Sequence, residues 1–320
     1  MTPAGISLGT VCVNAVIPQR GRSSEQPATV VKDAILGWER GARPELTAST
    51  NRAVTLAGFI SRVGDPVPLI DSDGDAHFAE DLVANAIRSA MRDLGARSAV
   101  VSHPSTWNDT AVASVTAALV RAKLRDVRLV AETTAVLTRA RQQRGYPSDG
   151  IVIIYDLGGG LTVSLAKASE TKAFAIIRTA DWGGADVDFG LLKRVLESID
   201  PPDDLAAIRR LVHEAKHDLS TETTTSIRLP GGGSVRLTRD DVGDLIREPV
   251  ERSLEVIEQI TIANDVELSS ITGIVLTGGG ATMPLVTEVL SSTFAVPVIR
   301  DDSPWLTAAL GAAATRGEQK

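Results

Sequence analysis

The 320-residue chain is long enough for two domains, or for two lobes with a cleft between them. Its hydrophobic content of 43% and charged content of 23% are ordinary for a globular protein. The formal net charge of −7 argues against nucleic-acid binding, because phosphate backbones need a basic excess. The single cysteine, Cys12, excludes an internal disulfide and a cysteine-based zinc cluster.

No apolar run approaches the roughly 20 residues that a membrane helix needs. The N-terminal stretch MTPAGISLGT also lacks the basic and then apolar pattern of a signal peptide. We therefore expect a protein of the cytoplasm, with no membrane-spanning segment and no nucleic-acid partner.

The first part of the chain alternates short apolar runs with helical periods. Residues 5–17 indicate two strands around Gly9-Thr10, and the polar stretch 18–75, broken by glycine and proline, indicates irregular strands and loops of a small subdomain. The expected elements that follow are a helix over 78–94, a strand over 98–104, a helix from the N-cap Asn108 to Lys123, a strand over 127–131 and a helix that begins at Glu132.

A basic cluster of Arg139, Arg141 and Arg144 comes at the end of that last helix. Such a cluster is typical of the solvated face of a helix end. The glycine- and proline-containing stretch 142–150 that includes it is the best candidate for a boundary within the chain.

The rest of the chain is organised around residues 151–169. An apolar strand over 151–155 ends at Asp156, glycines fill 158–160, and a second strand covers 161–166. Glycines supply backbone angles that other residues resist and leave their N–H groups uncovered, so this turn can form a concavity for phosphates. An Asp at the end of a strand suits a hydrated magnesium ion. A structural hairpin without a ligand is the alternative interpretation.

The second half begins again with strands around a glycine turn, which echoes the first half. The expected elements are a strand over 171–179, a glycine turn into a helix at 181–189, a helix from Pro201-Pro202 to Leu219, strands over 224–229 and 234–237, a helix over 240–264 bent at Pro249, a strand, glycine loop and helix start over 273–284, a strand over 296–299 and a helix from Pro304. His213 and His217 are spaced i, i+4 and could bind a metal, but the HExxH pattern and a third ligand are missing.

Several of these stretches occur in an informative order. They are SLGT at 7–10, the segment from VVSHP to AVL at 100–137, DLGGG at 156–160, WGGADVD at 182–188, HEAKHDLS at 213–220, LTGGGATMPLV at 276–286 and SPWLTAALGAAA at 303–314. In this order they resemble the nucleotide-binding domain of the DnaK-type seventy-kilodalton heat-shock chaperones, which belong to a superfamily with actin and the sugar kinases. Any one match is weak, but the collinear set covers nearly the whole chain.

The resemblance implies an α/β fold of the two-lobed, actin-like ATPase type. Each lobe would be a ribonuclease-H-like mixed sheet with flanking helices, and the cleft between lobes would close on a nucleotide. Lobe I would cover 1–147 and be closed by a C-terminal helix at 303–320, with a shortened outer subdomain at about 18–77. Lobe II would cover 148–302. The polar end ATRGEQK leads us to expect no peptide-binding domain after it; the alternative is that the chain is the head of a longer protein.

The same resemblance implies a site for ATP or ADP with Mg²⁺. Glu132 would be the catalytic acid, and Asp156 the second-loop acid that holds the metal through water. The backbone loops would bind the nucleotide through Gly9, Thr10, Gly158, Gly159, Gly160, Gly183, Gly184, Gly278, Gly279 and Gly280. Its adenosine side would be bound by Lys216, Ser220 and the ring of His217.

Other family positions are replaced. The replacements are Ser7 for the acid of the first phosphate loop, Leu161 and Val163 for a Thr and an acid of the second loop, Ile60 for the catalytic Lys, and Trp305 for a nucleotide-side Asp. Loss of one preorganised electrostatic group typically lowers a rate roughly 100- to 1,000-fold, and phosphoryl transfer depends on such groups. The departures therefore predict a degenerate pseudo-ATPase.

Three functions stay open from the sequence. The first is a pseudo-ATPase that binds ATP or ADP weakly, with little dependence on magnesium, and acts as a regulatory or scaffold module for a protein partner. The second is an active ATPase in which Lys32, Arg52 or Arg62 replaces the missing Lys. The third is an actin-like assembly subunit, and a sugar kinase is more distant. The fold class cannot choose among them.

Overall fold

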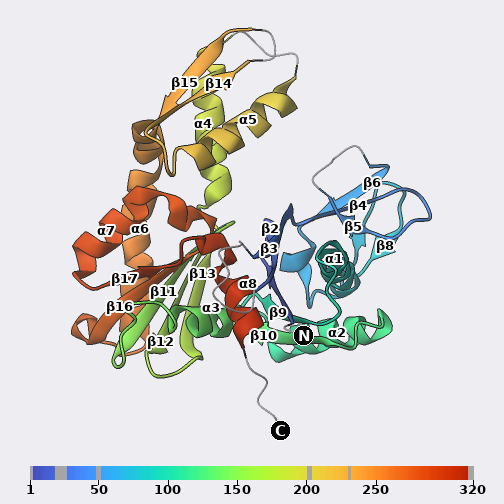
Figure 1. Ribbon diagram of the computed structural model, residues 1–320, viewed down its shortest axis with the longest axis horizontal. Helices are drawn as coiled ribbons and strands as arrows, with labels where there is room; N and C mark the ends of the chain where they lie inside the picture. The colour runs from blue at the N-terminus through green and yellow to red at the C-terminus, as the bar shows by residue number, and fades with distance from the viewer. Residues whose placement is uncertain (1–2, 19–26, 48–51, 200–203, 230–231, 316–320) are drawn as a thin grey trace. The chain divides into compact units, whose positions relative to one another are not determined.

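The computed structural model describes residues 3–18, 27–47, 52–199, 204–229 and 232–315 (Figure 1). Contacts between residues divide the chain into two compact units. Unit 1 comprises Met1–Tyr146, Lys167–Ala173 and Asp301–Lys320, and unit 2 comprises Pro147–Ala166 and Phe174–Arg300. The mixed α/β architecture, with several sheets and flanking helices, confirms the predicted actin-like ATPase class of fold.

Unit 1 is built on a five-stranded sheet of order β10-β9-β1-β2-β3. Its strands are β1 (Ala4–Leu8), β2 (Cys12–Ile17), β3 (Ala28–Asp33), β9 (Ala99–His103) and β10 (Val127–Ala131). The first three are joined as antiparallel neighbours, and β9 and β10 continue the sheet in parallel with β1. The central strands β1 and β9 are buried along their whole length, which is typical of strands covered on both faces.

The helices of unit 1 are α1 (Ala79–Asp93), α2 (Asp109–Arg121), α3 (Glu132–Ala140) and α8 (Thr307–Ala314), and the short turn η4 (Pro304–Leu306) precedes α8. The predicted cap is confirmed, since Asn108 Oδ1 accepts a hydrogen bond from Ala111 N at 2.9 Å. Glycines let α8 approach closely: a Cβ on Gly5 of β1 would lie 1.8 Å from Ala309 O, and one on Gly311 would lie 1.8 Å from Ala135 O of α3. The helix α8 therefore belongs to the core of unit 1.

The stretch expected to hold irregular strands and loops contains a small sheet of order β5-β4-β6. Its short elements are β4 (Ile35–Trp38), β5 (Glu45–Leu46), β6 (Val54–Ala57), the turn η1 (Phe59–Arg62), and a separate pair β7 (Leu69–Ile70) and β8 (Ala76–His77). Apolar side chains of this small sheet, Leu36, Trp38 and Leu46, are buried in the same core as those of α1. A short run of two to four residues gives too little periodicity for sequence-based recognition.

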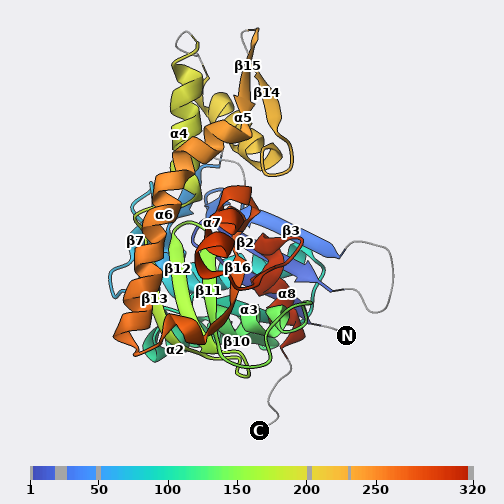
Figure 2. The same cartoon turned by 90° about the vertical axis from the view of Figure 1, so that its left-hand side faces the viewer.

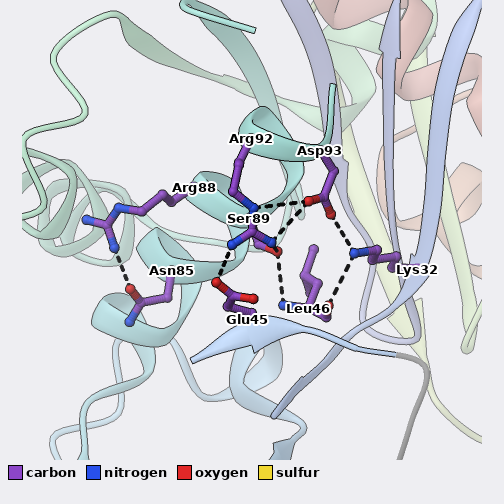
Figure 3. Close-up of polar contacts among 8 residues, drawn as sticks. All are labelled: Lys32, Glu45, Leu46, Asn85, Arg88, Ser89, Arg92 and Asp93. Carbon is purple, nitrogen blue, oxygen red and sulfur yellow. Dashed lines mark hydrogen bonds and ion pairs between the residues drawn. The ribbon is translucent and has the colours of Figure 1, made fainter. Parts of the chain in front are cut away.

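Polar contacts tie α1 to the strands beside it (Figure 3). Lys32 Nζ of β3 lies 2.5 Å from Asp93 Oδ2 and donates to Leu46 O at 3.3 Å. Leu46 N donates to Ser89 Oγ of α1 at 3.2 Å, and Arg92 pairs with Glu45 of β5. The pKa of Asp93 is held below its usual range although burial acts to raise it, because Lys32 and Arg92 donate to the carboxylate.

Unit 2 has a five-stranded sheet of order β13-β12-β11-β16-β17. Its strands are β11 (Ile151–Leu157), β12 (Leu161–Lys167), β13 (Ala173–Thr179), β16 (Ile271–Thr277) and β17 (Val298–Arg300). When the strands of each sheet are numbered along the chain, their order across the sheet is 3-2-1-4-5 in both units. In both, strands 4 and 5 run parallel to strand 1. The two sheets therefore share one topology, as the echo between the halves suggested.

The remaining elements of unit 2 are α4 (Gly184–Leu196), α5 (Leu205–Asp218), the hairpin of β14 (Thr224–Arg228) and β15 (Ser234–Thr238), α6 (Arg239–Ala263), the turns η2 (Leu268–Ser270) and η3 (Gly279–Thr282), and α7 (Pro284–Phe294). Figures 1 and 2 show α4, α5 and the hairpin gathered at one end of the unit, from which α6 extends. The helix α6 continues through Pro249. Pro201 and Pro202 lie outside the described residues.

The basic cluster at the end of α3 is only partly solvated. Arg141 and Arg144 are exposed, but Arg139 Nε pairs at 2.5 Å with Asp301 Oδ2, whose side chain is 6% exposed. The prediction of a solvated face is wrong for Arg139, because its partner lies far along the chain. Among the described residues, no helix is both long and apolar enough to cross a membrane.

Candidate functional site

The glycine loops of unit 2 meet at the ends of β11 and β16. Gly184 N at the start of α4 donates to Gly158 O at 3.0 Å, and a Cβ on Gly183 would lie 2.8 Å from Gly159 C. A Cβ on Gly278, after β16, would lie 2.4 Å from Leu157 O. The structure therefore brings the predicted loops 158–160, 183–184 and 278–280 into one cluster.

Packing requires some of these glycines. A Cβ would approach within 2.9 Å of other protein atoms at Gly160, Gly183, Gly278 and Gly280, and Gly278 also has a left-handed φ of +85°. A ligand is not needed to explain glycine at these positions.

Two other glycines have open space above them. Apart from chain neighbours, no atom of the described chain lies within 4 Å of a Cβ built on Gly158 or Gly279, and neither has a positive φ. Neither packing nor backbone conformation requires glycine there. At Gly184 the nearest atoms, Gly158 O and Lys216 Nζ, lie at an ordinary 3.6 Å. An open glycine backbone permits the close approach of a phosphate.

Asp156 stands at the end of β11, opposite Thr277 of β16. Burial raises the pKa of its carboxyl to about 6, and the positive charge of Arg178 acts in the opposite direction. Arg178 comes from β13, where Nη1 lies 3.4 Å from Thr162 Oγ1 and Nη2 lies 3.6 Å from the position of a Cβ on Gly160. A guanidinium therefore faces the second glycine loop.

Arg178 is a residue that sequence reasoning missed. It interrupts the otherwise apolar strand AFAIIRT shortly before the WGG turn. A single exposed cation in an otherwise apolar strand next to a ligand loop is the signal that could have found it.

The replaced positions of the second loop are core positions. Leu161 is 2% exposed and Val163 is fully buried, in a hydrophobic cluster with Leu157, Val187 and Leu191. The side chains of Leu and Val have no polar atom, so they can neither donate a hydrogen bond to a phosphate nor hold a metal.

A polar cluster joins α5 to α4. Lys216 Nζ lies 2.8 Å from Asp188 Oδ2 and donates to Gly184 O at 3.1 Å, and His213 Nδ1 lies 3.0 Å from the same Asp188 oxygen. Burial would raise the pKa of Asp188, but the contacts with His213 and Lys216 lower it. Within the described part of the chain, the buried Asp188 Oδ1 has no hydrogen-bond partner.

The other two predicted adenosine-side residues lie on or next to the same helix. His217 Nε2 lies 3.3 Å from His213 Nε2 with the rings edge to face, and burial lowers the pKa of His217. Ser220 Oγ donates to Thr282 Oγ1 at 3.1 Å, which connects the end of α5 to η3. The residues predicted for the adenosine side therefore lie together in unit 2.

The described residues offer no ready-made cluster of ligands for a divalent cation. No group of three or more His, Cys, Asp or Glu side chains within the described ranges is arranged to hold a metal. Mg²⁺ prefers carboxylate and water oxygens. In unit 2 the positive charge of Arg178 acts on the loop acid Asp156, and Val163 supplies no ligand.

The candidate residues of unit 1 are held by the fold. Gly9 N donates to Cys12 O at 3.0 Å, and a Cβ on Gly9 would lie 2.7 Å from that oxygen, so the turn itself requires glycine. Ser7 is buried in β1, while Thr10 and Glu132 are half-buried, and Glu132 begins α3. Ile60 is 1% exposed in the core of the unit.

The cations considered as substitutes for the missing Lys all have acidic partners. Lys32 pairs with Asp93, Arg52 Nη1 lies 3.6 Å from Glu39 Oε1, and Arg62 Nε lies 2.8 Å from Asp65 Oδ2. Trp305 is partly exposed, and its carbonyl accepts a hydrogen bond from Asn14 Nδ2 at 3.0 Å.

In comparison with families of known proteins, residues 78–317 match the family described as Hsp70 protein. The match covers about three quarters of the chain and includes all of unit 2. Ser7, Gly9, Thr10 and Ile60 precede the matched residues.

Proposed function

This chain belongs to the Hsp70 family, and we propose that within the family it is a pseudo-ATPase that binds ATP or ADP and hydrolyses ATP little or not at all. It is a chaperone-like nucleotide-binding protein, and Hsp70 family domains in general bind ATP or ADP with Mg²⁺. The proposal concerns what this chain has kept of that chemistry.

One observation carries the loss of hydrolysis. Leu161 and Val163 occupy the positions after the second glycine loop, and both are buried in the core of unit 2. A hydroxyl and an acid are thereby removed from the phosphate end, and no local rearrangement can restore them. Since phosphoryl transfer depends on positioned polar and charged groups, slow or absent turnover follows.

Other observations support retained binding. Gly158 and Gly279 keep an open backbone that the fold does not require, and Lys216, His217 and Ser220 stay grouped on the α5 side of the unit. An anion-binding site needs glycines whose backbone N–H groups are uncovered, and it would explain glycine at positions where neither packing nor φ requires it.

A protein that binds a nucleotide without hydrolysing it can act through the surface that it offers to another protein. We therefore propose a regulatory or scaffold function toward a protein partner, with nucleotide occupancy altering that surface. The lone thiol of Cys12 and the acidic net charge agree with a cytoplasmic protein that binds no nucleic acid.

An active ATPase is the second candidate, because Glu132 is kept at the start of α3. It would need Lys32, Arg52 or Arg62 to leave its acidic partner.

The test is a titration of ATP and of ADP into the purified chain, followed by single-turnover hydrolysis. Binding with phosphate release at the level of the buffer blank is the expected result. Glu132→Gln is the matched control, since any turnover that belongs to this chain must fall in that variant. Turnover at rates typical of the family, lost in Glu132→Gln, would refute the pseudo-ATPase.

A further inference from the structure

We infer that Arg178 takes the place of a divalent cation at the second glycine loop, so that this loop binds the phosphate end of a nucleotide without magnesium. The inference rests on the proposed nucleotide binding and names the group that makes it independent of metal. The anion recognised is a polyphosphate, whether free or part of a nucleotide.

The first step is the position of the guanidinium. Arg178 belongs to β13, next to β12 in the sheet, and its Nη1 lies 3.4 Å from Thr162 Oγ1 just after the loop. Its Nη2 lies 3.6 Å from the point where a Cβ of Gly160 would be. The cation is therefore in contact with the loop itself, within one unit of the fold.

The second step is the charge balance. Asp156 is the loop acid of unit 2, and Arg178 is the charge that acts on its half-buried carboxylate. A divalent cation entering here would meet a guanidinium, whereas an anion would meet one already oriented toward the loop. Like charges repel, so this arrangement favours an anion over a further cation.

The third step is the chemistry of the group. A guanidinium stays charged, and its planar fork donates two parallel hydrogen bonds to phosphate oxygens. Lys216, the other cation near these loops, is held by Asp188 Oδ2 at 2.8 Å and by Gly184 O at 3.1 Å. Arg178 lies on β13 beside this loop and carries the guanidinium that suits phosphate oxygens.

The experiment is calorimetric titration of inorganic tripolyphosphate, and separately of ADP, into the whole chain, each with EDTA and with Mg²⁺. For the wild type we expect binding in EDTA that is at least as tight as with Mg²⁺. Arg178→Ala should weaken tripolyphosphate binding roughly 10- to 100-fold, the loss expected for charge-assisted hydrogen bonds. Arg228→Ala, which removes one exposed arginine of β14, is the control that should leave binding unchanged.

The variant Asp156→Asn distinguishes anion binding by Arg178 from metal binding by Asp156. This test remains valid even if Arg178→Ala does not fold. If Arg178 binds the anion, removal of its competing carboxylate should tighten binding severalfold in EDTA. If Asp156 serves a metal, the same substitution should weaken binding in Mg²⁺. Arg178→Lys keeps the charge without the fork and should give an intermediate affinity.

The outcomes separate the two proposals. Binding of ADP only in the presence of Mg²⁺, or equal affinity in Arg178→Ala, would overturn the role of Arg178 and leave nucleotide binding intact. Tripolyphosphate binding that depends on Arg178, with ADP no tighter, would support the role of Arg178 and refute nucleotide recognition. Absence of binding by either probe under both conditions would refute both.

Discussion

The half-buried carboxyl of Asp156 should destabilise the folded chain at neutral pH. Its pKa is about 6 in the folded protein against an ordinary value of 3.8, because burial disfavours the charged form more than Arg178 favours it. A group with a raised folded pKa contributes stability below its unfolded pKa, and this contribution is lost as the pH rises through the folded pKa. A difference of about 2 pH units corresponds to about 3 kcal/mol.

The variant Asp156→Asn removes the charge and keeps the shape of the protonated acid. We expect it to be more stable than the wild type by up to about 3 kcal/mol at pH 8. The advantage should shrink between pH 6 and pH 4 and vanish below about pH 4, where the wild-type carboxyl is protonated in both states.

Urea denaturation of both proteins from pH 4 to pH 8, followed by circular dichroism, measures this difference. Arg178→Ala serves as the opposite control, since it removes the favourable charge and should lower stability at pH 8. A variant Asp156→Asn that is less stable than the wild type at pH 8, or a difference that does not change with pH, would refute the assignment of a carboxylate destabilised by desolvation.

Three further predictions follow from packing. Gly158→Ala should change the free energy of unfolding by no more than about 0.5 kcal/mol and weaken ADP binding, whereas Gly278→Ala should destabilise the fold by about 1–3 kcal/mol. Urea denaturation measures the stability of both variants, and calorimetric titration measures their ADP binding. A large loss of stability in Gly158→Ala would contradict the open space above that residue. Leu161→Thr should destabilise by about 1–3 kcal/mol without restoring turnover, because it buries a hydroxyl; recovered hydrolysis in a phosphate-release assay would show that the position faces the nucleotide. Arg139→Ala should destabilise by about 1–3 kcal/mol, because the buried Asp301 would keep only the hydrogen bond from Gln143 and lose its counter-charge; an unchanged thermal midpoint would argue against that pair.

Much of the fold could be predicted from the sequence because its signals are local. Periodicity and a cap residue located α2 after Asn108, and the glycine runs located the loops that cluster in unit 2. Each of these signals lies within a few residues of the element that it specifies.

The candidate site was less predictable because its decisive contacts join distant positions. Arg178 of β13 acts on Asp156 of β11 with β12 between them, and Arg139 meets Asp301 at a separation of 162 residues. A lone arginine in a strand carries no sign of its partner. The glycines also look alike in sequence, and only the atoms around Gly158 and Gly278 separate an open position from one that packing requires.

The placement of α8 has a consequence for the order of folding during synthesis. Unit 1 is complete only when α8 packs against Gly5 of β1 and against α3, yet residues 307–314 are made after all of unit 2. The face of β1 that α8 covers therefore stays without this helix while residues 9–306, nearly the whole protein, are synthesised. Unit 2, whose segments end at Arg300, can bury its core first, so the part made second is the part that can be finished first.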